Sequence, residues 1–411
     1  MRILFLGLNY RPEAIGIAIY SAGLCEYLAE QGHDVTAVVA KPYYPDWRVF
    51  DGWRGFGFRS GREEGIRVIR CPLYVPARPS GVKRLVHHLS FAVSALFPLI
   101  WNALRRRPDL VVTVAPSLIA APIAWLAAKL TGARSWLHVQ DFEVEAAFAT
   151  GLLDGSRPSA RLARAFEHRV LGLFDTVSSI SPEMCARLAA IGIPAERIHE
   201  FRNWADIDAI RPMDSAASPY RQRWGITTPH VALYSGNIAN KQGIEIVVEA
   251  ARRLAHRQDL TFVICGQGPN REALQASAAG VANIRFHDLQ PVDALGSLLG
   301  LATIHLLPQK ASAADLVLPS KLTNMLGSGK PIVATAAAGT CLAREVMGCG
   351  LVVEPENAEA FAAGIARLVD EPWLHAELAG EARGRAELRW SMEEVLKAVV
   401  ERMNEARSSE Y

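Results

Sequence analysis

The chain has 411 residues, of which 44 are Lys or Arg and 42 are Asp or Glu, so its net charge is +2. A nearly balanced charge excludes a protein whose whole surface binds polyanions. Half of the residues are hydrophobic and 21% are charged, which is typical of globular proteins, and the length predicts two domains of about 150–200 residues each.

Short apolar strands alternate with helical segments through the first half. A helix is expected around 17–31, directly after the first strand. The strands are apolar throughout rather than alternating, which favours a parallel sheet buried on both faces. The predicted strands are 2–8, 34–40, 66–71, 109–115, 135–140 and 175–181.

One segment of this half, residues 66–108, contains no Asp or Glu but eight Arg or Lys residues, including Arg105, Arg106 and Arg107. Within it, 89–104 is apolar, is interrupted by Pro98 and is shorter than the roughly 20 residues of a spanning helix. A basic helix with an apolar face suits an anionic membrane surface. The alternative is a core helix with a solvated basic end, and the sequence leaves both open.

The strand pattern restarts after a turn-rich segment at 201–225, with a helix expected at 243–256. We therefore predict an α/β protein of two doubly wound, Rossmann-like domains facing across a cleft, with the ligand beyond the carboxyl ends of the strands. The second set of predicted strands is 230–237, 260–266, 283–289, 302–308, 331–335 and 350–354. The predicted divisions are 1–205, 206–388 and 389–411, with C-terminal helices near 372–388 and 391–406 packing back across the seam.

The six cysteines are scattered, with no C-x-x-C pair and no spacing suited to zinc. They are expected to be free thiols in a reducing cytoplasm. The opening MRILFLGL has the length of a strand and is followed at once by polar residues, which argues against a signal peptide.

Glycine-containing loops follow three of the predicted strands. The first, LNYRPEAIG, contains Gly16 but not the G-x-G-x-x-G dinucleotide fingerprint, which disfavours a nicotinamide oxidoreductase. The second is SGNIANKQG, with Gly236 and Lys241, and the third is CGQGPN, with Gly266. Each glycine permits a close backbone approach to a ligand, and each is also explained by an ordinary turn.

The stretch PSKLTN places Ser320 and Lys321 at the start of a predicted helix. Lysine at a helix N-terminus is mildly unfavourable unless an anion binds there, because the macrodipole is already positive. Lys241 stands before another helix of the same domain. Two such lysines favour a diphosphate ligand over helix capping alone.

The ordered motifs resemble those of family 4 glycosyltransferases, which have the GT-B fold and transfer a sugar from a nucleotide donor with retention. The resemblance spans nearly the whole chain. The motifs YSGNIANKQG, KPYYPDW, RCPLYVP and PSKLTN are similar to the colanic-acid-biosynthesis branch, which is associated with fucosyl transfer in exopolysaccharide assembly. The other matching motifs are LNYRPEAIG, EYLAEQGHDV, SSISPEMCARL, NWADIDAIRP, CGQGP and RWSMEEV.

The resemblance implies roles for several residues. Lys241 and Lys321, with Ser320 beside the latter, would bind the donor diphosphate. Gly16 would lie under the donor sugar and the acceptor. The nucleotide would lie against Gly236 and Gly266, with Leu289 beside the base.

This sequence departs from the family pattern at the pair of glutamates that bind the sugar and the ribose. The second position is Asn324, whose amide can still bond a ribose hydroxyl. The first is Leu316, and the adjacent Asp315 serves the sugar only if the loop shifts by one residue. An arginine common in the SGN loop is Asn237 here, which leaves less positive charge for the phosphates.

A histidine common after the fifth strand is replaced by Gln140. Asp141 and Glu143 follow it and are candidates to orient the acceptor, although an exposed acidic loop explains them almost equally well. Asp315 completes the candidate catalytic set.

We therefore predict a retaining glycosyltransferase that moves a sugar, fucose by resemblance, from a nucleotide-diphosphate donor to a lipid-linked saccharide. GDP is expected over UDP on the branch resemblance alone. No metal-binding DxD-like motif, cofactor or nucleic-acid partner is expected, and the enzyme is placed peripherally on the inner face of the cytoplasmic membrane through 66–108. The alternatives are a nucleotide-sugar epimerase of the same architecture and a non-catalytic GT-B partner protein.

Overall fold

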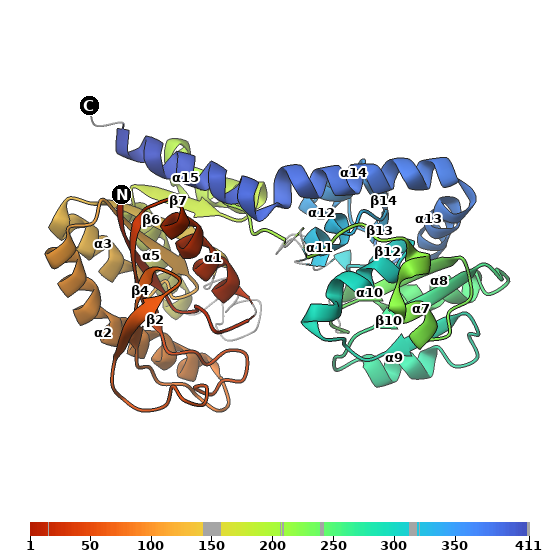
Figure 1. Cartoon of the computed structure of the whole chain (residues 1–411), viewed down its shortest axis with the longest axis horizontal. Coiled ribbons are helices and arrows are strands. Elements are labelled where there is room, and N and C mark those ends of the chain that lie inside the picture. The colour runs from red at the N-terminus through yellow and green to blue at the C-terminus, as the bar shows by residue number, and fades with distance from the viewer. Residues whose placement is uncertain are drawn as a thin grey trace. The chain divides into compact units, whose positions relative to one another are not determined.

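The computed structural model describes residues 1–14, 16–142, 158–205, 207, 209–238, 242–311, 319 and 321–408. The chain divides into two compact units (Figure 1). The first contains Met1–Asn203 together with Leu396–Tyr411, and the second contains Trp204–Val395. The predicted divisions followed residues 205 and 388, whereas these units divide after Asn203 and after Val395.

The first unit is built on an eight-stranded sheet with the order β3-β4-β2-β1-β5-β6-β7-β8. All neighbouring strands are parallel except β3 and β4, which are antiparallel. The strands are β1 (Arg2–Gly7), β2 (Asp34–Ala40), β3 (Arg59–Glu63), β4 (Ile66–Cys71), β5 (Leu110–Ala115), β6 (Arg134–Val139), β7 (Thr176–Ser179) and β8 (Ile198–Glu200).

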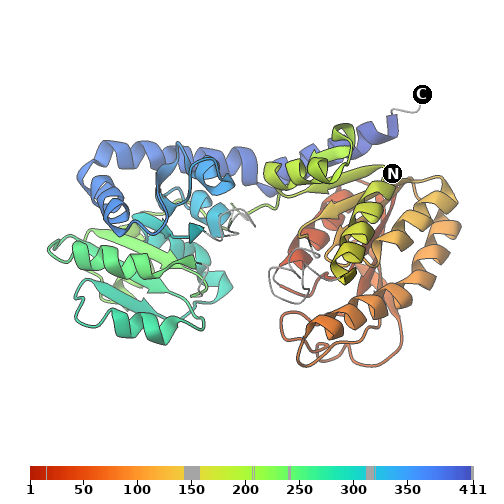
Figure 2. The ribbon, with the colours of Figure 1, turned by 180° about the vertical axis from the view of Figure 1, so that it is seen from behind.

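Helices cover this sheet, and two of them, α2 (Gly81–Arg106) and α3 (Ala121–Thr131), lie side by side (Figures 1 and 2). Phe91 and Leu99 of α2 join Leu4 and Val38 of the strands in one buried cluster, since apolar side chains of a helix and of a sheet face exclude water together. The helices are α1 (Ile17–Glu30), α2 (Gly81–Arg106), α3 (Ala121–Thr131), α5 (Pro158–Leu173), α6 (Pro182–Ile191) and, from Leu396 onward, α15 (Met392–Ser408).

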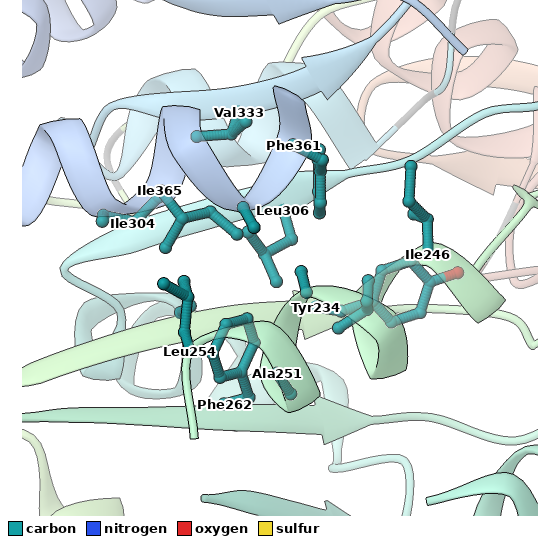
Figure 3. Close-up of a cluster of buried hydrophobic side chains, with 14 of the residues drawn as sticks. Tyr234, Ile246, Ala251, Leu254, Phe262, Ile304, Leu306, Val333, Phe361 and Ile365 are labelled. Carbon is teal, nitrogen blue, oxygen red and sulfur yellow. The ribbon is translucent and has the colours of Figure 1, made fainter. Parts of the chain in front are cut away.

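The second unit has a six-stranded, wholly parallel sheet with the order β11-β10-β9-β12-β13-β14. Successive residues of β9 face opposite sides, as strand geometry requires. Ala232 and Tyr234 join one hydrophobic cluster, shown in Figure 3, and Val231 and Leu233 join another. The strands are β9 (His230–Ser235), β10 (Leu260–Cys265), β11 (Ile284–His287), β12 (Ile304–Leu307), β13 (Ile332–Thr335) and β14 (Gly350–Val353).

The helices of the second unit cover both faces of its sheet. Phe361 and Ile365 pack over the Tyr234 face (Figure 3), and Leu298 packs over the opposite one. These helices are α7 (Pro219–Arg223), α8 (Glu245–Arg253), α9 (Arg271–Ser277), α10 (Leu295–Leu301), α11 (Lys321–Gly327), α12 (Cys341–Val346), α13 (Ala358–Asp370) and α14 (Pro372–Trp390).

The predicted fold class is confirmed, since each unit is a parallel-rich sheet wrapped in helices. Two strands were not predicted: β3 is almost entirely exposed and polar, and β8 has three residues. The apolar run at 89–104, which Pro98 interrupts, is part of a longer helix than its own length indicated. α2 runs unbroken from Gly81 to Arg106, because Pro98 lies on its buried face, where packing offsets the lost backbone hydrogen bond.

Candidate nucleotide-sugar site

The order of strands in the second unit marks one position on its sheet. From β9 the chain moves outward to β10 and β11 on one side, and β12, β13 and β14 form the other side. The loops that follow β9 and β12 therefore lead away from each other at the carboxyl ends of these two strands. Such a switch point is where open parallel sheets bind ligands.

The loop after β9 is held tightly against the loop after β10. A Cβ added at Gly266 would lie 1.9 Å from the Gly236 carbonyl oxygen, and one added at Gly268 would lie 2.2 Å from the Ile238 carbonyl oxygen. No side chain fits at these distances. Both glycines are thus explained by this close approach, which shapes the edge of the site, and not by a tight turn alone.

Lys321, the first residue of α11, reaches into this edge from the β12 side. Its Nζ lies 4.0 Å from the centroid of the Tyr234 ring, which belongs to β9. A Cβ added at Gly236 would lie 3.5 Å from Lys321 Cδ and 3.8 Å from Nζ. The lysine side chain therefore spans the switch point and lies directly against the glycine loop.

The ammonium group of Lys321 is unusual electrostatically. Its nitrogen is buried and has no hydrogen-bond partner among the described residues. Burial lowers the pKa of Lys321 from the usual 10.5 to about 7, because a charged group loses its hydration there without gaining a counter-charge. A buried amine with its donors unsatisfied is the chemistry that an anionic ligand would complete.

Three other predicted residues of the second unit lie within the described part of the chain. Asn324 lies one helical turn after Lys321 and is half-buried, so both face the same side of α11. Asn237 is exposed in the β9 loop, and its Oδ1 would be 2.6 Å from a Cβ added at Gly268. Leu289 is 57% exposed in the segment after β11.

Five predicted residues lie outside the described residues: Glu143, Lys241, Asp315, Leu316 and Ser320.

The motifs did not single out two residues that help build this edge. Tyr234 forms the floor beneath Lys321, and its hydroxyl donates to the Asn237 carbonyl oxygen at 2.5 Å. Arg271 donates to the Gly266 carbonyl oxygen at 2.9 Å and pairs with Asp288, so it ties the β10 loop to the segment after β11. The sequence places Tyr234 near the end of a predicted strand and Arg271 near the start of a helix. It does not indicate which residues these two side chains contact.

In the first unit, the predicted Gly16 lies in the loop after β1, the strand at that sheet's own switch point. Its φ of 65° and ψ of −146° are favourable only for glycine. The loop is anchored by Glu13, whose buried carboxylate accepts from the backbone N–H groups of Tyr43 and Tyr44 at 2.8 and 2.9 Å. Burial raises the pKa of Glu13 despite these bonds. The loops after β1 and β2 thus form one surface.

The predicted Asp141 is exposed just beyond β6. The residue before it, Gln140, is buried and exchanges two hydrogen bonds with Asn203, at 2.8 and 2.9 Å. Gln140 also contacts His138, whose pKa burial lowers to about 3. Gln140 therefore has a structural partner set of its own, which the sequence comparison with a histidine did not suggest.

The outer face of α2 carries a continuous stripe of exposed apolar side chains. Phe97 is 71% exposed and Trp101 is 54% exposed. Among the described residues α2 alone is long and apolar enough to cross a membrane, by length and composition, and a third of its apolar window is buried within the unit. The other exposed members of the stripe are Val82, Leu85, Val86, Leu89, Val93, Leu96 and Leu104.

Within the described ranges, no three His, Cys, Asp or Glu residues are grouped closely enough to hold a metal ion. The same part of the chain contains six cysteines, all of them free thiols.

Two family models match the chain. Residues 16–204 match a glycosyl transferase 4-like domain, and residues 229–371 match the glycosyl transferases of group 1. The putative colanic acid biosynthesis glycosyl transferase WcaI of Escherichia coli (strain K12) is 44% identical over 375 residues, which cover 89% of this chain and 91% of that protein. The chain belongs to glycosyltransferase family 4. It is accordingly a glycosyltransferase of the GT-B fold, as predicted.

Solved structures agree with this fold. A sucrose-phosphate synthase of Thermosynechococcus elongatus is similar with a TM-score of 0.71 at 18% identity, and 100% of each chain is covered. HepE of Anabaena, in complex with UDP, is similar with a TM-score of 0.69 at 15% identity, covering 98% of this chain and 100% of that one. At this level of identity the likeness concerns the fold alone.

Proposed function

We propose that this glycosyltransferase moves a sugar from a nucleotide-diphosphate donor to a lipid-linked saccharide during exopolysaccharide biosynthesis of the colanic-acid type. The observation that carries the proposal is the buried, unpartnered ammonium of Lys321 beside the Gly236 loop at a sheet switch point. The similarity to the putative colanic acid enzyme supports the pathway.

The proposed role of Lys321 is to stabilise the leaving diphosphate. Negative charge builds on the diphosphate oxygen as the glycosidic bond breaks, and a fixed ammonium in a desolvated site stabilises that charge without reorganisation. Lys241 and Ser320 are proposed to contact the same diphosphate. Asn324, one turn from Lys321, is proposed to bond a ribose hydroxyl.

The transfer is proposed to proceed with retention, through an oxocarbenium-like state, without a metal ion. Gly16 would allow the donor sugar to approach the loop after β1. Asp141 and Glu143 are proposed to orient the acceptor, and Asp315 the sugar hydroxyls. The GDP-linked donor, with fucose as the transferred sugar, is proposed from the branch resemblance.

Thermal unfolding of the whole protein against GDP, UDP, ADP and NAD tests the donor site. A ligand at 100 times its dissociation constant stabilises the fold by about 2.7 kcal/mol. We expect GDP to raise the melting temperature and NAD to leave it unchanged. Lys321→Met should weaken nucleotide binding about ten- to a hundredfold, since one charge-assisted contact is lost.

The same variant separates binding from folding. Lys321→Met removes an amine whose donors are unsatisfied, so the unligated variant should be at least as stable as the wild type. Lys397→Met, at an exposed site on α15, is the control and should change neither property. If no nucleotide stabilises the wild type, the donor site is not where we place it, and the non-catalytic alternative is favoured.

We further propose that α2 places the enzyme peripherally on the inner face of the cytoplasmic membrane. Its exposed apolar stripe is flanked by Lys83 and Arg84 at one end and by Arg105 and Arg106 at the other. An apolar stripe with basic ends suits insertion to headgroup depth in an anionic leaflet.

Vesicle sedimentation tests this contact. Replacing Arg105, Arg106 and Arg107 by Gln should weaken binding to anionic vesicles, and Phe97→Asp should weaken it further, because the apolar contribution is lost. Arg161→Gln and Arg164→Gln on α5 remove charge elsewhere on the unit and serve as controls. Unchanged vesicle binding in the α2 variants would reject the membrane contact.

A further inference from the structure

A second group of cations lies at one edge of the first-unit sheet, next to the loop of Gly16, whose Tyr10 ring lies 5.3 Å from the Arg70 guanidinium carbon. Lys41 follows β2, Arg70 lies near the end of β4, and Arg59 begins β3. Arg59 and Arg70 are directly opposite each other in the antiparallel β3–β4 pair. The guanidinium carbons of both lie over the ring of Trp53, at 5.5 and 5.0 Å from its centroid.

The charges of this group are not balanced. Arg70 is paired with Glu63, whose carboxylate accepts from Nη2 at 2.5 Å, yet Arg70 Nη1 is buried without a partner. Among the described residues, neither Lys41 nor Arg59 has a carboxylate partner. Lys41 is 2% exposed, and its ammonium group, which has three N–H donors, donates one hydrogen bond to the Gly55 carbonyl oxygen at 2.6 Å.

This arrangement is unfavourable for an empty surface. Like charges directly opposite each other in a β-pair are destabilising, and Arg59 and Arg70 occupy such positions. Burial and the nearby Arg59 both lower the pKa of Lys41, which means that the ammonium there lacks compensation. A bound anion would supply the missing counter-charge.

The segment that covers Lys41 also presents large apolar side chains to solvent. Phe56 is 99% exposed and Phe58 is 52% exposed, and both follow Gly55, whose carbonyl accepts from Lys41. Gly55 has a φ of 105°, a conformation that other residues rarely adopt. Cations beneath a loop with exposed aromatic rings match a ligand that joins a phosphate to an apolar chain.

We propose that Lys41, Arg59 and the loop around Phe56 and Phe58 bind the phosphate and the adjoining lipid of a prenyl-phosphate-type acceptor. This inference rests on the proposed transfer to a lipid-linked saccharide and adds the part of the acceptor that the enzyme recognises. The phosphate binds to Lys41 and Arg59, and the first apolar units of the chain lie against the two phenylalanines.

The test uses the whole protein and three kinds of vesicle: phosphatidylcholine alone, phosphatidylcholine with a prenyl diphosphate, and phosphatidylcholine with phosphatidylglycerol at the same surface charge. The wild type should prefer the prenyl diphosphate vesicles, and inorganic pyrophosphate should compete for them. Arg59→Gln should reduce the preference for prenyl diphosphate vesicles about tenfold, because one charge-assisted contact to the phosphate is lost.

Arg62→Gln is the matched control. It makes the same change of charge on the same strand, but residues 59 and 62 face opposite sides of β3. Equal loss in the two variants, or no preference over phosphatidylglycerol, would overturn the site in favour of general attraction to anionic lipid. Failure of pyrophosphate to compete would also overturn it, since the binding would then depend on the lipid chain alone.

Two further measurements keep the interpretation clear. Arg59 is exposed, so Arg59→Gln should keep the wild-type melting temperature, and a lower one would assign Arg59 to the fold instead. Its stabilisation by nucleotide should also be unchanged. If the wild type binds no nucleotide yet prefers prenyl diphosphate, the donor proposal fails while this site stands, and the converse result rejects this site alone.

Discussion

At the scale of single residues, Lys321 determines the chemistry of the candidate donor site. Its amine lies over the Tyr234 ring with no hydrogen-bond partner among the described residues, and burial lowers its pKa to about 7. Near neutral pH the empty site therefore holds a mixture of amine and ammonium. A bound diphosphate favours the ammonium and raises this pKa again.

This linkage predicts how nucleotide binding depends on pH. Below about pH 7 the lysine is already charged, so binding takes up no proton there. Above it, the ligand has to recharge the amine, so affinity should fall by up to about tenfold per pH unit until the pKa of the complex is reached.

Titration calorimetry from about pH 6 to about pH 9 in buffers of different ionisation enthalpy measures the proton uptake directly. In Lys321→Met this uptake should disappear. Uptake that persists in the variant would assign the proton to a different group.

At the scale of elements, the loops after β9 and β10 pack directly against each other. The carbonyl of Gly236 occupies the space that any side chain at Gly266 would need. The geometry of this edge of the candidate donor site thus depends on the absence of a Cβ at Gly266.

We expect Gly266→Ala to destabilise the protein by about 1–3 kcal/mol and to weaken nucleotide binding, because a Cβ 1.9 Å from an oxygen displaces the loop. Gly380→Ala is the matched control. Gly380 lies on an exposed face of α14 with nothing within 4 Å of an added Cβ, so this change should stabilise by about 0.5–1 kcal/mol. Thermal unfolding and nucleotide titration measure both; equal stability of the two variants would contradict the packing argument.

The buried elements were predictable and the exposed ones were not. Strands such as β5 and β10 are buried at every residue, so their apolar runs indicated them directly. Strand β3 reads RSGRE and is paired only along one edge, so no hydrophobic pattern marks it. The full length of α2 around Pro98 was not predictable either, because the packing that offsets the lost hydrogen bond comes from distant parts of the chain.

For the candidate site, the loop residues were predictable from the sequence, but the side chains they contact were not. The motif at Lys321 and the glycines at 236 and 266 were identified from loop chemistry, and the structure brings these three together. The ring of Tyr234 beneath the amine could not be inferred, because two segments more than 80 residues apart meet there only through the β9–β12 pairing. The cation group of Lys41 and Arg59 depends on β3 in the same way.

At the scale of the whole molecule, the first unit is discontinuous in sequence. Its last part is α15, in which Val399 and Met403 are 4% and 2% exposed. Arg402 and Glu405 of α15 also act electrostatically on His199, the middle residue of β8. The helix is therefore a structural part of the unit that contains the N-terminus.

A matched pair of substitutions tests this dependence. Val399→Asp buries an unpaired carboxylate and should destabilise the first unit by about 3–5 kcal/mol, whereas Ala398→Asp places the same residue on the exposed side of α15. Hydrogen exchange should show faster exchange in β5 and β6 for Val399→Asp only, with β9 and β10 protected as in the wild type. Faster exchange in both sheets would mean that the units do not unfold separately.

The discontinuity of the first unit also bears on how the protein is made. Ribosomes release a chain from its N-terminus, and domains generally fold in that order. Here all residues of the second unit, Trp204–Val395, are synthesised before Leu396 and the rest of α15. The second unit is therefore complete first, and the sheet that begins at Arg2 waits for a helix translated almost 400 residues later.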